Sequence, residues 1–406
     1  MKFSSRIPAL FACFLIAFAA GCEGNRPGGR ELVIALAVFP GEAAHYRYFV
    51  SDFERRQHVH VEIVAESYND ILRALRAEAS AGHGRIDLAE LDLAILGEAR
   101  ASVRSVDEIV GGSQRALFPE SAWQAATAGH HLYFIPHRLM WQAMIYNRLE
   151  VPHPPRTWVE LKDFARLHPG KLALKAARYE GNVCDVMPFV WSAGGDELAP
   201  GAVGSIRALN FIGSLGPDLN PESAVFREMS VLEAQARGSV WIHFNWPFAM
   251  GYLAGKGLAP QVDLSAPIPS GPDGTATPLG GGYLAISRSA PHPELAAAFL
   301  KYLLTPEVQM RLSRELGWYG SVTPTSGSAE AALYAGFTAM RPYVRARPVV
   351  CDYAKLSNLW QNAVREVLFG NEAPRAELED VAAKFKRQRI CSETNTATGK
   401  DSDSGG

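Results

Sequence analysis

The sequence predicts an α/β protein with two lobes. At 406 residues the chain is longer than one hydrophobic core usually supports, and two lobes suit this length. Hydrophobic residues make up 48% of the chain and charged residues 20%, which is typical of a well-packed globular protein. Between residues 32 and 96, strand patterns alternate with helical patterns, and this order predicts a parallel sheet with right-handed crossovers.

The first 21 residues have the pattern of an export signal. Lys2 and Arg6 form a short basic region, and residues 7–20 form an apolar run that is shorter than the about twenty residues of a membrane span. Small residues then lead into Cys22, as at a lipoprotein processing site. We expect Cys22 to be acylated and to anchor the exported chain to the cell envelope, on the periplasmic or outer face of the membrane. Ordinary signal cleavage after Ala19 is the alternative.

Both ends of the mature chain are predicted to be unpacked. Residues 22–30 form a tether rich in Gly, Pro and Asn, and residues 392–406 form a small, polar, disordered tail. Without the two basic residues of the signal, the basic count falls from 40 to 38 against 42 acidic side chains, a net charge of −4. A mildly acidic chain without basic clusters argues against nucleic acid as a partner.

The segment after the tether supplies the alternating elements. An apolar run at residues 32–39 is typical of a strand buried on both faces. Tyr46, Phe49, Val50 and Phe53 then recur at the spacing of a buried helix face. The elements that follow are, in order, a strand at 59–65, a helix at 68–79 and a strand with its turn at 86–96.

Ligand contacts are expected at the carboxyl ends of these strands, because open parallel sheets bind ligands there. The three loops concerned are residues 40–45, 66–70 and 92–96, and they contain Glu42, Asn69 and Asp92. The alternative for Asp92 is a cap on the following helix. The alternative for Glu42 is a solvated first-turn residue favoured by the helix dipole.

The middle and the end of the chain give further elements. Residues 133–147 predict two strands with a turn near Arg138. A Pro-rich stretch delays the next helix until Thr157, which can cap it, with Glu160 three residues later in a capping box. Later helices are predicted to begin at Pro306 and to span 353–369 and 374–388.

Motifs of enzymes are missing from the sequence. It contains no G-x-S-x-G, H-E-x-x-H, C-x-x-C, Walker loop or G-x-G-x-x-G, so it gives an enzyme no support and suggests no cofactor. The histidines that could suggest a metal site lack clustered carboxylates and a further ligand, so we expect none; they are His58, His60, His130 and His131.

Residues 241–324 carry a resemblance to a known family. They join the aromatic turn Asn245-Trp246-Pro247-Phe248, the triple glycine at 280–282 and a helix beginning at Thr305-Pro306 in a fixed order. This order resembles the extracellular solute-binding proteins of the family 1 type, which are receptors of bacterial ABC importers for sugars and related solutes. Residues 176–185 are similar to the Tyr-Glu-Gly-x-x-Cys stretch of the trehalose- and maltose-binding branch.

The resemblance implies a two-lobed periplasmic-binding-protein type II fold with three interlobe crossings. Lobe 1 would be residues 31–145 plus 281–320, and lobe 2 residues 146–280 plus 321–391. The protein would act as a monomer that closes around a sugar, a disaccharide or oligosaccharide, and passes it to an ABC permease driven by a separate ATPase. The alternatives are a carbohydrate-active enzyme and a receptor coupled to a sensor kinase, on the same exported scaffold.

The resemblance also implies ligand contacts from both lobes. Sugars need carboxylates and amides that accept from hydroxyls, and aromatic faces that stack on the ring. The implied contacts are Asp92, Tyr179, Glu180, Asn245, Trp246, Phe248, Gly281, Gly282, Trp318 and Tyr319. For the glycines the alternative is a hinge turn without ligand contact, and for the others it is packing at a helix end, in the core or at the hinge.

One position departs from the pattern of the family. In many sugar-binding relatives the turn aligned with residues 137–141 carries an aromatic residue and then an acid, and here Arg138 and Met140 take those places. A guanidinium in place of a carboxylate predicts a ligand contact from Arg138. It would shift preference toward a substituted or anionic sugar, or toward a different solute.

Besides Cys22, three cysteines remain after processing, namely Cys184, Cys351 and Cys391. If the helices at 353–369 and 374–388 are antiparallel, Cys351 and Cys391 lie at the same end, within reach of a disulfide in an oxidising compartment. Cys184 is then expected to be free and buried.

Overall fold

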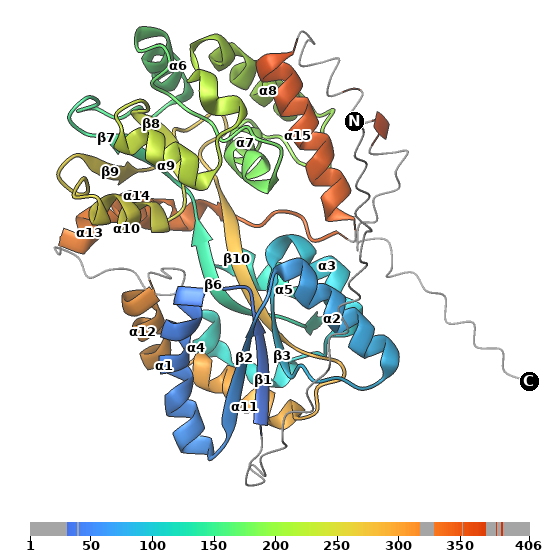
Figure 1. Ribbon diagram of the computed structural model, residues 1–406. Helices are drawn as coiled ribbons and strands as arrows, with labels where there is room; N and C mark the ends of the chain where they lie inside the picture. Colours follow the sequence, from blue (N-terminus) through green and yellow to red (C-terminus); the bar gives the residue numbers. More distant parts are fainter. Residues whose placement is uncertain are drawn as a thin grey trace, which may run out of the picture.

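The computed structural model describes residues 31–38, 40–316, 329–350, 352–370, 379 and 383–384. Two lobes, each with its own sheet and helices, are joined by strand β10 (Thr277–Ile286) and by the pair β6 (Ile135–Trp141) and β7 (Ala143–Asn147) (Figure 1). The prediction of a two-lobed α/β protein is confirmed. The predictions for the signal, the tether, the tail, Cys22, Trp318, Tyr319 and the Cys351–Cys391 pair concern residues outside the described part of the chain.

The first lobe is built on a six-stranded mixed sheet. Its path is β11-β10-β3-β1-β2, with β11 at Val344–Arg345, and β6 pairs with β10 off this path. Strands β1 (Glu31–Leu36), β2 (His60–Ala65) and β3 (Leu88–Asp92) are parallel, as predicted, whereas β10 runs antiparallel to β3 and β6. The apolar run of β1 is buried from Leu32 to Leu36, as expected of a central strand.

Helices α1 (Pro40–Gln57) and α2 (Tyr68–Ala81) make the first two crossovers. Tyr46, Phe49, Val50 and Phe53 of α1 are all buried, which confirms their predicted face. The predicted loop at 40–45 is wrong, because α1 already begins at Pro40, whose fixed φ suits a first helical turn. The smaller elements of this lobe are η1 (Leu93–Ile95), α3 (Leu96–Ala99), η2 (Arg100–Ser102), η3 (Asp107–Ile109), α4 (Gly112–Arg115), α5 (Glu120–Ala126), β4 (Thr127–Ala128), β5 (His131–Leu132), α11 (Pro293–Leu303) and α12 (Pro306–Leu316).

The second lobe has a three-stranded antiparallel sheet in the order β8-β7-β9, with β8 at Ile242–Asn245 and β9 at Asp263–Ala266. Its helices are α6 (Trp158–Leu167), α7 (Glu180–Ser192), α8 (Val203–Leu215), η4 (Gly216–Asp218), η5 (Pro221–Ala224), α9 (Glu228–Ala236), α10 (Phe248–Gly255), α13 (Ala329–Leu333), α14 (Ala335–Met340), η6 (Arg341–Tyr343) and α15 (Tyr353–Phe369). Helix α15 has the predicted bounds and packs on α7 and α8 (Figure 1). In the part of the chain that is described, no helix is long and apolar enough to cross a membrane.

The cap of helix α6 follows the sequence prediction. The Thr157 side chain accepts a hydrogen bond of 3.2 Å from the Glu160 N–H. The Glu160 carboxylate reaches back one residue further than in a standard capping box, to the Arg156 N–H at 2.7 Å. Thr157 and Glu160, the two residues of the predicted capping box, therefore both bind backbone N–H groups at the start of the helix.

The junction between β6 and β7 differs from the prediction. Two strands are present, but the break falls at Gln142, and the predicted turn near Arg138 is wrong. Arg138 lies inside β6 because the residues before it and after it in that strand are both paired with β10. The Thr277 hydroxyl donates to the Gln142 carbonyl at 2.8 Å, which ties the start of β10 to the same crossing. The predicted division into lobes stays a prediction.

Cys184 lies in α7, is buried and forms no disulfide, as predicted. Burial raises the pKa of its thiol well above the usual range. We therefore expect this cysteine to be inert toward thiol reagents in the folded protein.

Asp263, at the start of β9, makes the stability of the second lobe depend on pH. Gln235 donates to its Oδ1 at 2.7 Å, Oδ2 has no hydrogen-bond partner among the described residues, and burial raises the pKa of the carboxyl to about 6. The folded state therefore binds this proton more tightly than the unfolded state, so the unfolding free energy falls as pH rises from about 4 to about 6.

Asp263→Asn should remove this pH dependence and raise the unfolding free energy at pH 7 by about 2 kcal/mol. Urea denaturation between pH 4 and 8 measures it. Asp163→Asn, at an exposed position of α6, is the control and should leave the profile of the wild type unchanged. If Asp263→Asn kept the pH dependence of the wild-type unfolding free energy, Asp263 would not be its cause.

Candidate functional site

The candidate site lies where β10 runs between β3 and β6. Gly282 pairs with Asp92 on β3 and with Arg138 on β6, so the three residues form one row across the sheet. In the next row Gly280 pairs with Met140. Paired residues share a face of the sheet, and the two glycines leave the middle of this face without side chains.

Two of the glycines are required by close approach of neighbouring groups. Gly281 has φ of 116°, and a Cβ there would collide with the carbonyl oxygen of Arg138. A Cβ at Gly282 would collide with the carboxylate of Glu90. The triple glycine therefore lets β10 pass between two strands and leaves room for a buried polar group. These close approaches explain the triple glycine without any ligand contact.

Glu90 is the centre of a buried hydrogen-bond network that we did not predict. Its carboxylate accepts from the Ala37 N–H at 3.0 Å and lies 3.1 Å from Nδ1 of His137, whose Nε2 lies 3.1 Å from the Tyr46 hydroxyl. Burial alone would raise the pKa of Glu90, but the Arg138 guanidinium and these hydrogen bonds hold it below the ordinary value. Glu90 is therefore a carboxylate with its acceptor sites occupied.

Arg138 points into this network. Its Nη2 lies 3.2 Å from Glu90 Oε2, 2.7 Å from the Ala37 carbonyl and 3.0 Å from the Tyr68 hydroxyl, and the residue is buried. The contacts join β6 to β3, to the chain after β1 and to the start of α2. The guanidinium predicted to face a ligand is thus bonded within the first lobe.

Asp92 lies at the carboxyl end of β3, as predicted, and its side chain is 27% exposed. Its Oδ1 accepts from the Ala94 N–H at 2.8 Å, so the alternative, a cap on the next helical turn, is present in the structure. Arg347 Nη2 lies 3.7 Å from the same oxygen. Burial raises the pKa of Asp92 against the opposing effect of Arg347.

Glu180 begins α7 in the second lobe and is held by the segment that leads into α15. It accepts hydrogen bonds from Arg347, from the Tyr353 hydroxyl at 2.6 Å and from the Ser357 hydroxyl at 2.5 Å. Since Arg347 also faces Asp92, one buried guanidinium joins a carboxylate of each lobe. Arg347 gave no signal in the sequence.

The aromatic turn of the second lobe reaches the glycine row. Asn245 is fully buried and holds the turn, because its side chain accepts from the Trp246 N–H at 2.9 Å and donates to the Glu228 carbonyl at 3.2 Å. The Trp246 ring covers Gly280, where a Cβ would lie 2.8 Å from Cη2 of the ring, and 8% of the residue is exposed. Phe248, the first residue of α10, is 41% exposed.

The other predicted contacts are spread more widely. Asn69 is exposed at the start of α2, and Glu42 lies in the first turn of α1, where its side chain is not described. Tyr179 precedes α7, and its ring packs under the Arg227 guanidinium at 4.6 Å. The structure therefore brings together Asp92, Arg138, Gly281, Gly282 and Trp246, and Arg347 joins Glu180 to Asp92 at the same place. Asn245 and Tyr179 are held by contacts within the second lobe.

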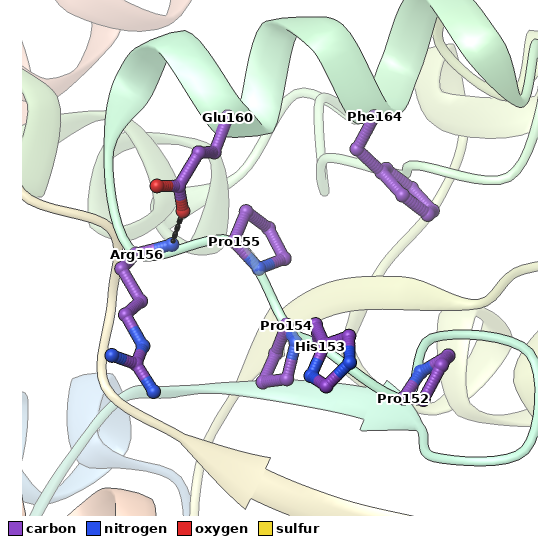
Figure 2. A pocket seen from close by; sticks show the side chains of 7 residues that line it. All are labelled: Pro152, His153, Pro154, Pro155, Arg156, Glu160 and Phe164. Atoms are coloured by element: carbon purple, nitrogen blue, oxygen red, sulfur yellow. Dashed lines mark hydrogen bonds between the residues drawn. The ribbon is translucent and has the colours of Figure 1, made fainter.

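One surface cavity lies away from the strand crossing. A cavity of about 540 Å³ is lined by the Pro-rich stretch at 152–156 and by Glu160 and Phe164 of α6 (Figure 2). Its one carboxylate, Glu160, is bonded to the Arg156 N–H, as Figure 2 shows, and serves the helix cap. In the described part of the chain, no group of three or more His, Cys, Asp or Glu side chains could hold a metal ion.

Comparisons with known proteins agree with this architecture. The maltotriose-binding protein of Pyrococcus abyssi is 24% identical over 373 residues, which are 87% of this chain and 79% of that protein. Two solved structures share the two-lobed fold. The cyclic alpha-maltosyl-1,6-maltose binding protein from Arthrobacter globiformis has a TM-score of 0.76 at 19% identity and covers 88% of this chain and 98% of its own. The maltose-bound MalE3 of T. maritima has 0.74 at 20% identity, covering 89% and 100%.

The family itself is shown by a match over most of the chain. The model of the bacterial extracellular solute-binding proteins matches residues 49–341, from α1 to the end of α14 and so across both lobes. The predicted resemblance to extracellular solute-binding proteins is confirmed. These relatives are binding proteins rather than enzymes. The chain belongs to the family of bacterial extracellular solute-binding proteins.

Proposed function

We propose that this protein is the sugar receptor of an ABC importer, which closes its two lobes around a disaccharide or oligosaccharide and delivers it to a membrane permease. The observation that carries the proposal is the position of Trp246. This aromatic residue of the second lobe covers Gly280, at the carboxyl end of the first-lobe strands. Both lobes therefore contribute to one place, as hinge closure requires. The sugars named for the relatives, maltose and maltotriose, support the solute class.

The chemistry of the partly exposed residues suits a sugar. Asp92 offers a carboxylate to hydroxyls, and Asn69 offers an amide at the start of α2. Phe248 offers an aromatic face from the second lobe. The buried residues Glu90 and Asn245 have a different part, because they hold the strand crossing and the aromatic turn in place.

Binding is a better match to these groups than catalysis. A glycosidase needs two carboxylates that act on one scissile bond. Glu90 is fully buried and bonded to Arg138, and Asp92 caps the turn after β3 and faces Arg347.

We further propose acylation at Cys22 as the anchor, with the tether at 22–30 between the membrane and the lobes. Mass spectrometry of the mature N-terminus distinguishes this from cleavage after Ala19.

A thermal-shift and calorimetric screen with maltose, maltotriose and trehalose tests the proposed function. A sugar present at a hundred times its dissociation constant should add about 2.7 kcal/mol to the stability of the mature protein. Phe248→Ala should weaken binding about tenfold or more, because it removes an exposed stacking face. Phe369→Ala, at a position of α15 that is 43% exposed, is the matched control and should bind like wild type. Absence of binding to any sugar would contradict the proposal.

A further inference from the structure

Charged groups at the strand crossing are arranged in two sets. In the first set Glu90 and Arg138 lie 3.2 Å apart, on neighbours of β10, with Gly282 between them. In the second set Arg347 faces both Asp92 and Glu180. Among the described residues, the crossing therefore holds two guanidinium groups and three carboxylates. The balance is negative.

Arg138 is held by the folded chain itself. Its guanidinium bonds to Glu90, to the Ala37 carbonyl and to the Tyr68 hydroxyl, and these three groups belong to the first lobe. Gly282 makes this possible, because any side chain there would occupy the space of the Glu90 carboxylate. A buried guanidinium whose charge is neutralised by a buried carboxylate attracts an added anion only weakly. The charge of Arg138, the residue from which an anionic solute was expected, is thus neutralised inside the protein.

Among the charged residues of these two sets, those that remain partly exposed are acids, namely Asp92 and Glu180, whose side chain is 34% exposed. Asp92 has a side chain 27% exposed, whereas Arg138 and Arg347 are buried. A carboxylate or phosphate on a ligand would meet Asp92 as a like charge, which costs binding energy and gives selectivity against that ligand. A neutral hydroxyl would instead donate a charge-assisted hydrogen bond to the same oxygens.

We propose that the site selects uncharged sugars against sugar acids and sugar phosphates, and that Arg138 is a positioning residue, the counter-ion of Glu90, rather than an anion receptor. This inference rests on the proposed function and deepens it. Arg138 acts through Glu90 and the start of α2, whereas Asp92 sets the preference for the uncharged ligand.

Calorimetry of the wild-type mature protein with two matched pairs tests the selectivity. The pairs are maltose with maltose 1-phosphate, and glucose with glucuronate. We expect each charged member to bind at least about tenfold more weakly at low salt, with a smaller gap at high salt because exposed charges are screened. Asp92→Asn should narrow this difference in affinity, and Asp352→Asn, which removes a partly exposed acid before α15, should not. A charged member that binds as tightly as its neutral partner would overturn the inference.

The role of Arg138 as an internal counter-ion is tested without any sugar. Sulfate at constant ionic strength is added to wild type and to Arg138→Gln, and each melting temperature is compared with its own value in chloride. Equal shifts support an internal counter-ion, and a shift seen only in wild type overturns it. If no neutral sugar binds, the proposed function fails, while the sulfate comparison still decides the part of Arg138. If Arg138→Gln does not fold, competition of sulfate with maltose in wild type replaces it, and competition would contradict the inference.

Discussion

Lys175→Met is expected to lower the free energy of unfolding by about 3–5 kcal/mol, because it leaves a buried carboxylate without its cation. Lys175 is fully buried, and its ammonium binds the Asp185 carboxylate and the Phe244 carbonyl. The backbone N–H of Lys175 donates to the second Asp185 oxygen at 2.8 Å. Burial raises the pKa of Asp185, and the ammonium opposes that rise. Removing the ammonium therefore exposes the full cost of the buried acid.

The loss should be felt at the crossing between the lobes. Gln142, at the break between β6 and β7, donates to Asp185 at 3.1 Å, and its carbonyl accepts from the Thr277 hydroxyl. The pair Lys175–Asp185 thus supports the junction of β6 with β10 from inside the second lobe. A change in the denaturant slope, m, together with the midpoint would indicate that the two lobes no longer unfold as one unit.

Urea denaturation followed by tryptophan fluorescence measures the effect. Lys355→Met is the control, since Lys355 is exposed and its pair with Asp352 should be worth less than about 1 kcal/mol. The double variant Lys175→Met with Asp185→Leu should recover most of the loss, because two apolar side chains replace the whole pair. A loss below about 1 kcal/mol in the single variant would show that Asp185 is accommodated without the cation.

The sequence predicted elements whose signal is local. The buried run of β1, the face of α1, the Thr157 cap and the bounds of α15 all follow from spacing or from caps within one segment. The turn near Arg138 was wrong because a local pattern cannot show that β10, far along the chain, pairs with β6 on both sides of that residue. The start of α1 at Pro40 was missed because an extended loop and a Pro-led first turn have the same composition.

The candidate site was predictable only in part, for the same reason. Glu90 and Asp92 are two residues apart on one strand and so share a face, a signal that was present in the sequence. Arg347 had no such signal, because it is placed beside Asp92 and Glu180 only by the return of the chain after β11 (Val344–Arg345). Sequence reasoning identified residue types at strand ends, and it could not identify which charges neutralise each other.

Glu90→Gln is the second large effect, and we expect it to lower the free energy of unfolding by about 3–5 kcal/mol. The amide keeps the size of the carboxylate, so Gly282 still fits against it, but Arg138 loses the buried carboxylate that faces it. The variant also changes the response to acid. Because the pKa of Glu90 is held below the ordinary 4.5, its contribution is present above that value and is lost as pH falls through the folded pKa.

A matched surface change isolates the cause. Glu62 pairs with Arg85 near the edge of the same sheet, both side chains are partly exposed, and Glu62→Gln should cost at most about 1 kcal/mol. Glu90→Gln combined with Arg138→Met should be more stable than Glu90→Gln alone, because the buried guanidinium is removed together with the carboxylate that faced it. If the double variant is instead the less stable, Arg138 contributes through its bonds to Ala37 and Tyr68 rather than through Glu90. The explanation of Arg138 as the counter-ion of Glu90 would then have to be abandoned. The argument that Arg138 does not attract an anionic solute would fail with it.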